Sequence, residues 1–458
     1  MAGLFGLSVD PTVYKGNFSE DLFWGTFYQQ HLGEEYAGLS TSDGQTIRVQ
    51  THRGLFRPTF STNLKELKGA VGLTEGTGYC GSDREPFLVE SKVGEWSVCF
   101  SGNVINLAEL VERFKNFGHI FEKRGERITD IEVLAKLIAQ GESIIDGIGR
   151  MEKEIKGAFC LLVLTKEGIF AARSSIGHWP LVIGQKEGAV VIASEPGGFC
   201  NNGFKLVRDI EPGEIIFAKD GRWEQKRIMP NDGRIQICSF IWVYTAFANG
   251  VFERIPASLV RKKLGAALAR RDIEKGFIPD IVAPVPDSGK FHAMGYFGEF
   301  CRQVNAGVIN KLPQYDEVLL KYPYAGRSFM PQTKEVRDEA AHIKLVISGE
   351  DYSGKIVVIC DDSIVRGTQT QTNLVPKLKA LGIAEIHFRI SNPELLSHCP
   401  WGKTTKKGET LASRLPDKKD RIKFLGIKSL EYCTIEDLVL AIGLPRELLC
   451  VDCSLKSD

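Results

Sequence analysis

A strand, two acids and a loop of small and hydroxyl residues follow one another at 357–370, in the string VVICDDSIVRGTQT. The apolar run 357–360 is typical of a buried strand, and it ends in Asp361 and Asp362. In open α/β sheets, ligands lie beyond the carboxyl ends of the strands. Carboxylates at that edge suit ribose hydroxyls and a Mg²⁺ ion. An ordinary strand with an acidic loop is the alternative, and the length of the string favours a binding site.

The residues that follow the acid pair, 363–370, suit a phosphate group. A loop of backbone N–H groups that opens a helix attracts an anion. Gly367 would let the backbone approach closely, and Thr368 and Thr370 would supply hydroxyl donors. The sequence therefore predicts a site for a phosphorylated ribose at this edge.

Strands that alternate with helices after residue 234 predict the parallel sheet that would position this site. They are an amphipathic helix at 256–271 and apolar strands at 279–289, 355–363 and 384–391. Before residue 225, short strands at 96–102, 159–165, 168–174 and 189–195 and helices at 105–117 and 130–138 indicate a mixed α+β region. The polar stretch 227–234 between the two regions reads as a linker, so we expect domains at 1–230 and 231–458.

Composition excludes several classes of protein. The chain has 458 residues, with 58 Lys plus Arg against 57 Asp plus Glu, which argues against a general binder of nucleic acids or membrane surfaces. No apolar run approaches the roughly 20 residues of a membrane span, and the first residues carry no export signal, so we expect a cytoplasmic protein. Seven of the eleven cysteines read as small buried side chains: Cys80, Cys99, Cys160, Cys200, Cys301, Cys360 and Cys433.

The string DDSIVRGT resembles the motif with which type I phosphoribosyltransferases bind 5-phosphoribosyl-1-pyrophosphate (PRPP), and above all that of the amidophosphoribosyltransferase family. Further segments agree in order along the chain, among them LGAALAR at 264–270 and QQHLGEEYAG at 29–38. The resemblance implies a PRPP site made of Asp361, Asp362, Ser363, Arg366, Gly367, Thr368, Gln369 and Thr370. A local departure is Pro376, which should kink the helix after the loop.

Two other segments resemble parts of the same family's transferase site. PVPDSG at 284–289 is similar to its pyrophosphate loop, in which Asp287, Ser288 and Gly289 would bind substrate and Ser288 would join Asp361 and Asp362 in holding Mg²⁺. The segment 326–345 resembles its mobile catalytic loop, in which Arg327 and Lys344 would neutralise the departing pyrophosphate.

Four cysteines form a separate set. CVDC at 450–453 is a CxxC motif, and by itself it fits a redox site or zinc as well as a cluster. One branch of the resembled family holds a [4Fe–4S] cluster, and its ligand positions fall on Cys238, Cys399, Cys450 and Cys453. Structural zinc is the alternative at these thiols.

The N-terminal half resembles the family's glutaminase domain, of the N-terminal-nucleophile (Ntn, αββα) class, but its catalytic positions differ. That chemistry needs an N-terminal cysteine, and Ala2 stands there. The arginine that pairs with the glutamine carboxylate is replaced by Glu75, the Asn of the oxyanion pair becomes Ser101 beside Gly102, and Ser174 replaces an acid expected to hold the substrate amine. We therefore expect this glutaminase site to be inactive.

The resemblance implies an enzyme that transfers a phosphoribosyl group from PRPP to ammonia or another amine and releases pyrophosphate, as a dimer or tetramer. Three alternatives stay open. The first is an ordinary glutamine-dependent enzyme of purine synthesis, which Ala2 opposes. The second is a PRPP-sensing regulator without turnover, which the retained segment 326–345 opposes. The third is transfer to a different acceptor.

Overall fold

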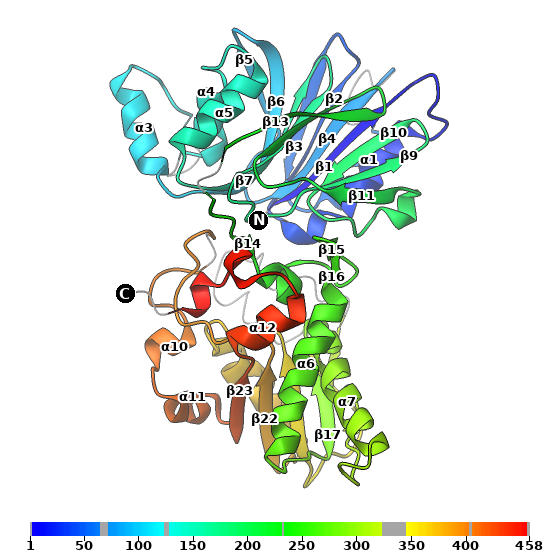
Figure 1. Cartoon of the computed structure of the whole chain (residues 1–458), viewed down its shortest axis with the longest axis vertical. Helices are drawn as coiled ribbons and strands as arrows, with labels where there is room; N and C mark the ends of the chain where they lie inside the picture. The colour runs from blue at the N-terminus through cyan, green and yellow to red at the C-terminus, as the bar shows by residue number, and fades with distance from the viewer. Residues whose placement is uncertain are drawn as a thin grey trace. The chain divides into compact units, whose positions relative to one another are not determined.

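The computed structural model describes residues 2–64, 72–122, 128–230, 233–322, 345–402 and 405–455. The chain divides into two compact units, each described here by itself: Met1–Cys238 with Gly250–Arg254, and Ser239–Asn249 with Ile255–Asp458 (Figure 1). The sequence placed one boundary at 230/231, whereas the chain leaves the first unit after Cys238 and returns to it at 250–254. The returning segment contains β15 (Val251–Phe252) and the turn that leads from it to β16 (Ile255–Pro256).

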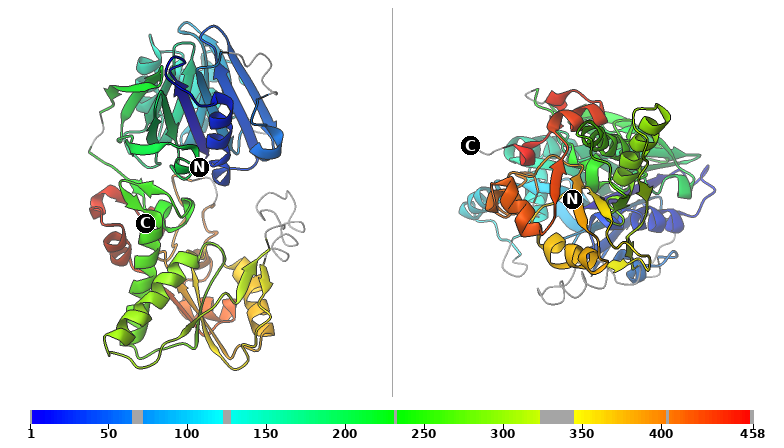
Figure 2. Two further views of the ribbon diagram at one scale, coloured as in Figure 1. Left: turned by 90° about the vertical axis from the view of Figure 1, so that its right-hand side faces the viewer. Right: turned by 90° about the horizontal axis from the view of Figure 1, so that it is seen from below.

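The first unit is built on two antiparallel sheets that pack face to face (Figure 2). The seven-stranded sheet has the order β11 (Lys205–Asp209), β9 (Val182–Lys186), β10 (Ala189–Ala193), β1 (Gly3–Val9), β4 (Glu75–Gly81), β2 (Tyr36–Ser42) and β3 (Ile47–Arg53). The six-stranded sheet has the order β13 (Arg222–Ile228), β12 (Glu214–Lys219), β8 (Ile169–Arg173), β7 (Gly157–Thr165), β6 (Gly94–Val104) and β5 (Phe87–Ser91). The two sheets lie close together at Gly6, where a Cβ would be in van der Waals contact with Leu162 at 3.4 Å.

Helices cover the outer faces of both sheets and complete an αββα arrangement. Helices α1 (Phe18–Phe27) and α2 (Phe56–Thr59) bury aromatic residues against the sheet that contains β1. Against the other sheet, α3 (Leu107–Asn116), α4 (Asp130–Ile138) and α5 (Ile144–Glu154) enclose a cluster of aliphatic and aromatic side chains. Two short 3₁₀ turns, η1 (Gln30–Leu32) and η2 (Cys200–Asn202), complete this unit. The strands and helices expected before residue 225 are confirmed in kind, and α4 has the expected bounds.

The second unit contains a five-stranded, fully parallel sheet, as expected. Its order is β18 (Gln314–Tyr315), β17 (Ile281–Pro284), β21 (Ile356–Asp361), β22 (Glu385–Ile390) and β23 (Ser429–Tyr432). The chain order of the strands is therefore 2-1-3-4-5, which reverses direction between β17 and β21. Doubly wound sheets bind ligands at such a reversal, beyond the carboxyl ends of the strands.

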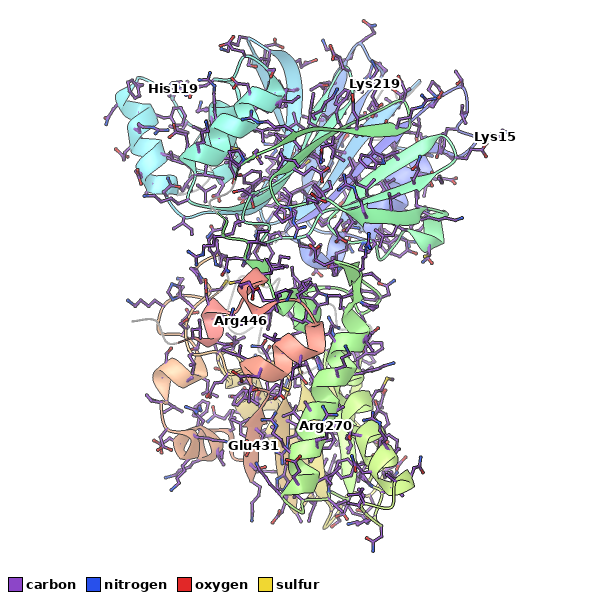
Figure 3. The ribbon with its side chains drawn as sticks, viewed as in Figure 1. Lys15, His119, Lys219, Arg270, Glu431 and Arg446 are labelled. Carbon is purple, nitrogen blue, oxygen red and sulfur yellow. The ribbon has the colours of Figure 1, made fainter. Side chains whose placement is uncertain are left out.

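Alternating residues of the strands face different helices. Val357 and Ile359 pack with α9 (Val375–Ala380), whereas Arg389 on β22 binds Asp272 of α6 (Ala257–Glu274) through two hydrogen bonds of 2.5 and 2.9 Å. Helix α6 packs along α7 (Lys290–Asn305), and Arg270 on α6 (Figure 3) forms an ion pair with Glu299 of α7. The remaining elements are β19 (Leu319–Lys321), β20 (Leu345–Ile347), α10 (Leu411–Arg414), α11 (Lys418–Leu425), α12 (Ile435–Ile442), η6 (Arg446–Leu448) and η7 (Asp452–Ser454).

Pro376 lies inside a continuous helical run over 368–380, in which the π-turn η5 (Thr370–Leu374) leads directly into α9. Proline lacks the N–H that an interior helical position would donate, and π-turns occur where the regular hydrogen bonding of a helix is interrupted. The kink expected at Pro376 stays a prediction. Among the described residues, no helix has the length and apolarity needed to cross a membrane.

Candidate functional site

The ends of β17 and β21 meet at the reversal of strand order. Pro284 lies opposite Cys360 in the sheet, and the N–H of Val285 donates to the Cys360 carbonyl at 2.9 Å. Residues 285–289 then turn into α7. A Cβ on Gly289 would lie 2.1 Å from the Cys360 oxygen, so only glycine lets the two strand ends come this close.

The acid pair faces this loop, and one hydrogen bond joins the two segments. Ser288 Oγ donates to Asp361 Oδ1 at 2.8 Å, across 73 residues of sequence. Asp361 is partly buried, Asp362 is buried, and the Ser363 hydroxyl donates to the Asp362 carboxylate. Burial, and then the charge of Asp362, raises the pKa of Asp361 well above its usual range, while burial also raises the pKa of Asp362. Two carboxylates without a cation tend to repel, so the pair suits hydroxyl donors and a metal ion.

The loop after the acid pair has the features of an anion cradle. Gly367 has φ +72°, a left-handed conformation that glycine adopts without strain. Thr368 and Gln369 are exposed, and in the described part of the chain the N–H groups of Gly367, Thr368 and Gln369 donate to no other protein group. Thr370 then begins η5. These donors suit a phosphate group.

Arg366 has a protein partner beside this loop. Its Nε donates to Glu409 Oε2 at 3.1 Å, and Nη2 contacts the same oxygen. The Arg414 guanidinium donates to the Arg366 carbonyl. Arg366 therefore braces the loop against the segment around α10, and a role in substrate binding would require the Glu409 pair to open.

Two lysines that sequence reasoning missed lie at the pyrophosphate-type loop. Lys321 Nζ donates to Asp287 at 2.7 Å, and Lys290 Nζ lies 3.2 Å from the same carboxylate. Burial opposes ionisation of Asp287, but the two lysines prevail and lower its pKa. Lys321 ends β19, which pairs with β20 around the segment 323–344. Arg327 and Lys344, expected in the catalytic loop, lie outside the described residues.

The donor set suits Mg²⁺ that arrives with a phosphorylated substrate. Asp361, Asp362 and Ser288 offer oxygen atoms, which Mg²⁺ prefers. In the described ranges, no three acidic, histidine or cysteine side chains converge as a metal site. Mg²⁺ is usually held by one or two carboxylates together with substrate phosphates.

The start of β1 forms a second candidate site, in the first unit. The N–H of Ala2 donates to Ser101 Oγ at 2.9 Å, and Ser194 Oγ donates to the Ala2 carbonyl at 3.3 Å. Ala2 therefore lies beside Ser101 of β6. Gly102 follows Ser101, and a Cβ there would lie 2.1 Å from the Ala158 oxygen.

Ser174 lies in the same row of the sheet as Gly102. Gly102 is opposite Phe159 on β7, and the N–H of Ser174 donates to the Phe159 carbonyl at 2.9 Å. Because β7 lies between them, Gly102 and Ser174 are two strand spacings apart, a distance of about 10 Å. Ser174 Oγ is buried without a hydrogen-bond partner in the described residues. Its proposed place in a former substrate site stays a prediction.

The expectation for Glu75 is wrong. Glu75 lies opposite Ser8, at the other end of β1 from Ala2, a distance of about 20 Å along a strand. Its Oε1 accepts hydrogen bonds from Ser8 Oγ at 3.0 Å and from the N–H of Asp220 at 3.4 Å. The residues of β4 beside the start of β1 are Tyr79 and Cys80. Glu75 therefore cannot repel a ligand bound at Ala2.

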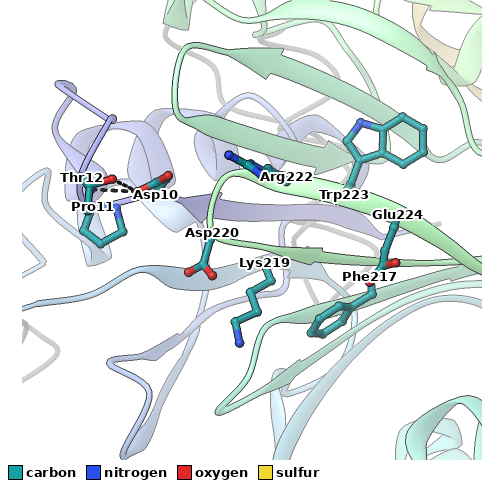
Figure 4. A pocket seen from close by; sticks show the side chains of 9 residues that line it. All are labelled: Asp10, Pro11, Thr12, Phe217, Lys219, Asp220, Arg222, Trp223 and Glu224. Carbon is teal, nitrogen blue, oxygen red and sulfur yellow. Dashed lines mark hydrogen bonds between the residues drawn. The ribbon is translucent and has the colours of Figure 1, made fainter.

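A hollow of about 670 Å³ lies at the Glu75 end of β1, between the turn at 10–12 and the β12–β13 hairpin (Figure 4). The Asp10 carboxylate accepts hydrogen bonds from the N–H and hydroxyl of Thr12 within it. The lining residues are Asp10, Pro11, Thr12, Phe217, Lys219, Asp220, Arg222, Trp223 and Glu224. Because it lies at the opposite end of β1 from Ala2, this hollow is separate from the glutaminase-type positions.

Asp130 is a buried acid near the second site that the sequence did not single out. It begins α4, and its Oδ2 accepts a hydrogen bond from the N–H of Val104 at 3.3 Å. Val104 ends β6, the strand that carries Ser101 and Gly102. The sequence signal that could have identified Asp130 was an acidic residue in the first turn of a predicted helix.

Three of the four predicted ligand cysteines lie together in the second unit. The N–H groups of Leu396 and Ser397 donate to the Cys453 carbonyl at 2.8 and 3.1 Å, just before Cys399. Burial raises the pKa of Cys450 and of Cys453 to about 12, and the neighbouring Cys399 contributes to both shifts. Cys238 ends β14 (Ile237–Cys238), and Cys450 ends β24 (Leu449–Cys450).

Thiolate donors suit iron–sulfur clusters and zinc. The described side chains nevertheless form no group of three that could hold a metal ion as they stand. Of the other seven cysteines, Cys200 is exposed and Cys301 partly exposed, so the expected burial is wrong for these two.

Known proteins resemble the chain over almost its whole length. Residues 79–201 match the family described as a glutamine amidotransferase domain. The amidophosphoribosyltransferase of Methanocaldococcus jannaschii is 33% identical over 480 residues, which cover 99% of this chain and 96% of the relative. The chain belongs to the amidophosphoribosyltransferase family.

Other members of the amidophosphoribosyltransferase family agree in sequence and in structure. The Methanothermobacter thermautotrophicus enzyme is 33% identical over 96% of this chain and 90% of its own length. The solved glutamine PRPP amidotransferase of Bacillus subtilis, in complex with ADP and GMP, superposes with a TM-score of 0.84 at 28% identity, covering 98% of this chain and 96% of that one. The fold class expected from the sequence, an Ntn-type amidotransferase domain followed by a phosphoribosyltransferase domain with a parallel sheet, is confirmed.

Proposed function

We propose that this member of the family binds PRPP with Mg²⁺ and transfers the phosphoribosyl group to ammonia or another small amine, without using glutamine directly. The hydrogen bond between Ser288 and Asp361 is the observation that carries the transferase half of this proposal. It brings the pyrophosphate-type loop and the acid pair to one point at the reversal of strand order, where a sugar with phosphates at both ends fits.

The proposed roles follow from the chemistry of each group. Asp361 and Asp362 accept hydrogen bonds from the ribose hydroxyls, and the loop 363–370 binds the 5-phosphate through its N–H groups. Ser288 and Gly289 contact the pyrophosphate, with Lys290 and Lys321 near enough to take part in neutralising it. Mg²⁺, held by Asp361, Asp362 and Ser288, supplies positive charge to the phosphate oxygens.

In the reaction, the bond between ribose C1 and the pyrophosphate oxygen breaks and a bond between C1 and the amine nitrogen forms. The bonding electron pair leaves with pyrophosphate, and the amine loses a proton to solvent. Arg327 and Lys344, which lie outside the described residues, are proposed to stabilise the departing charge.

The second half of the proposal, that glutamine is not used, is supported by Ala2. The family's chemistry uses a thiol as nucleophile and a free amine as base. The methyl side chain of Ala2 cannot attack an amide, and the N–H of Ala2 donates a hydrogen bond to Ser101 Oγ. The ammonia would come from solution or from a partner protein. The rival proposal is an ordinary glutamine-dependent enzyme, favoured by the match of residues 79–201 to a glutamine amidotransferase domain.

Pyrophosphate release in the presence of PRPP and Mg²⁺ tests both halves. Parallel reactions would contain ammonium chloride, glutamine or neither, with protein purified without oxygen. Release with ammonium alone is the expected result. Release with glutamine would overturn the second half, and tight PRPP binding with release in neither reaction would indicate a sensor or a different acceptor.

The same proposal extends to the cysteines and to assembly. Cys238, Cys399, Cys450 and Cys453 are proposed to hold a [4Fe–4S] cluster, with structural zinc as the alternative, and the chain to form a dimer or tetramer. Iron, sulfide and zinc analysis of anaerobically purified protein distinguishes the two metals. Cys453→Ser should remove the bound metal, whereas Cys200→Ser, at an exposed cysteine, should retain it.

A further inference from the structure

The first residue of α7 carries a positive charge that the helix itself does not favour. Lys290 begins α7 directly after the pyrophosphate-type loop 285–289, with Gly289 as the N-cap. The N-terminus of a helix favours negative charge, because the aligned peptide dipoles have their positive end there. Side chains of a helix lean back toward its N-terminus, so Lys290 leans toward the loop. Its placement indicates a use for a cation at this loop.

Two carboxylates from different parts of the chain share this lysine. Lys290 Nζ lies 3.2 Å from Asp287 Oδ1 and 3.4 Å from Glu317 Oε1. Asp287 also accepts a hydrogen bond from Lys321 Nζ at 2.7 Å, so negative and positive side chains alternate. The four side chains are between 32% and 52% exposed. Solvent weakens such pairs, so a more highly charged anion can displace a carboxylate from them.

This row of charges adjoins the proposed site for ribose and metal. Ser288 of the same loop donates to Asp361 Oδ1 at 2.8 Å. Glu317 follows β18, which pairs in parallel with β17, the strand that leads into the loop. The carboxyl ends of both strands lie at one edge of the sheet, where the pyrophosphate of PRPP is proposed to bind. A diphosphate carries more charge than a carboxylate, and lysine binds phosphate groups as a point charge.

We propose that Lys290 and Glu317 together set the affinity of this site for pyrophosphate. Lys290 binds the pyrophosphate group, both as part of PRPP and as the released product. Glu317 competes with pyrophosphate for the charge of Lys290 and keeps the product weakly enough bound to leave. This inference rests on the proposed function. It assigns opposite effects to the two residues, because loss of Lys290 weakens pyrophosphate binding and loss of Glu317 strengthens it.

Lys290→Met and Lys311→Met form the first matched pair of variants. Lys311 pairs with Asp280 at 2.8 Å, before β17 and therefore at the opposite edge of the sheet. Both variants lose a contact between a lysine and an aspartate, but only Lys290 lies at the loop. Lys290→Arg keeps the charge and should retain pyrophosphate binding.

Glu317→Gln and Asp316→Asn form the second matched pair. Asp316 is the preceding residue, and its Oδ2 accepts a hydrogen bond from the Tyr352 hydroxyl at 2.9 Å. Both variants replace an acid by its amide in the same segment. Glu317 contacts Lys290, whereas Asp316 binds a tyrosine.

Calorimetry would measure the binding of inorganic pyrophosphate with Mg²⁺, and the ammonium-driven reaction would give its inhibition constant against PRPP. We expect the dissociation constant of pyrophosphate to rise about tenfold in Lys290→Met, the size of one charged hydrogen bond. In Glu317→Gln we expect it to fall about threefold, the size of one exposed ion pair. Lys311→Met and Asp316→Asn should bind pyrophosphate as the unmodified protein does.

Weaker pyrophosphate binding in Glu317→Gln, or unchanged binding in Lys290→Met, would overturn the inference. Thermal unfolding shows which variants remain folded, and Glu317→Gln tests the sign by itself if Lys290→Met is unstable. If the unmodified protein binds neither PRPP nor pyrophosphate, the proposed function falls together with the inference. If it binds both and the two variants do not differ in sign, only the roles of Lys290 and Glu317 fall.

Discussion

The backbone N–H of Ala2 donates a hydrogen bond to the hydroxyl of Ser101, across 2.9 Å and 99 residues of sequence. From the sequence, we predict that these two residues stand where the resembled glutaminases have their nucleophile and one oxyanion donor. The side chain of Ala2 is a methyl group, and Ser101 Oγ accepts a hydrogen bond at a position where an asparagine is expected to donate one. The altered pair thus forms a structural link between β1 and β6.

A thiol at position 2 should not be enough to create a glutaminase. In Ala2→Cys we expect glutamate release from glutamine to stay at the background rate, because the side-chain amide donor at position 101 is absent, a loss that typically costs about 10²–10³ in rate. The measurement is glutamate formation, with mass spectrometry to verify that Met1 has been removed.

The double variant Ala2→Cys with Ser101→Asn is the comparison for this prediction. It should release more glutamate than Ala2→Cys, since it restores the missing donor. Rapid glutamate release by Ala2→Cys alone would mean that the rest of the glutamine site is intact.

Glu75 should make the first unit less stable as the pH rises. Burial raises its pKa well above the usual value, so the folded protein holds a proton that the unfolded chain releases more readily. Its contribution to stability is full below the unfolded pKa and is lost as the pH rises through the folded pKa. Glu75→Gln should therefore raise the melting temperature at pH 7–8 and leave it unchanged near pH 4, as thermal unfolding followed by circular dichroism would show.

Glu214 provides a control of the opposite sign. Its buried carboxylate forms an ion pair with Arg208 at 2.5 Å. Burial by itself would raise the pKa of Glu214, but the hydrogen bonds that its carboxylate accepts from Arg208 and neighbouring groups outweigh burial and lower that pKa. Glu214→Gln should thus lower the melting temperature at neutral pH, where the ionised form stabilises the fold. A lower melting temperature for Glu75→Gln at pH 8 would contradict the assignment of Glu75 as a protonated buried acid.

The meeting of the acid pair and the pyrophosphate-type loop was predictable, because both segments directly follow the strands that place them. Asp361 and Asp362 follow an apolar strand directly, and the carboxyl ends of neighbouring parallel strands lie at one edge whatever the details of packing. The same rule brought Ser288 to this edge. The lysine partners of Asp287 could not be predicted, because Lys321 comes from a hairpin whose pairing joins β19 to a strand beyond residue 344.

Glu75 was misplaced for a related physical reason. Its position depends on the register between β1 and β4, and a register is set by pairing over more than sixty residues, here Ser8 with Glu75. Motif spacing within β4 alone does not contain that information. The ion-pair partner of Arg366 could not be predicted for the same reason, because Glu409 lies 43 residues later in the chain.

Asp362→Asn should weaken PRPP binding by about 10- to 100-fold, the range of one charged hydrogen bond. An amide keeps the size of the side chain but removes the charge that suits ribose hydroxyls and Mg²⁺. Asp280→Asn is the matched control, since Asp280 precedes β17 at the opposite edge of the same sheet, where it binds Lys311 and the N–H of Ile356. The affinity would be measured by calorimetry, and equal losses in both variants would argue against an acid-pair site.

Comparing Gly367→Ala with Gly354→Ala distinguishes a loss of folding stability, caused by a left-handed backbone conformation, from a loss of substrate binding by the 363–370 loop. Gly367 and Gly354 have φ of +72° and +71°, so alanine at either position should cost about 1–2 kcal/mol of folding stability. Only at Gly367 would the new Cβ crowd Leu411 and Leu425, at 3.1 and 3.2 Å, and displace the N–H groups that face the proposed 5-phosphate. Gly354 has open space around it. We therefore expect both variants to lose a few degrees in melting temperature, while only Gly367→Ala raises the KM for PRPP, and an unchanged KM in Gly367→Ala would remove this loop from the phosphate site.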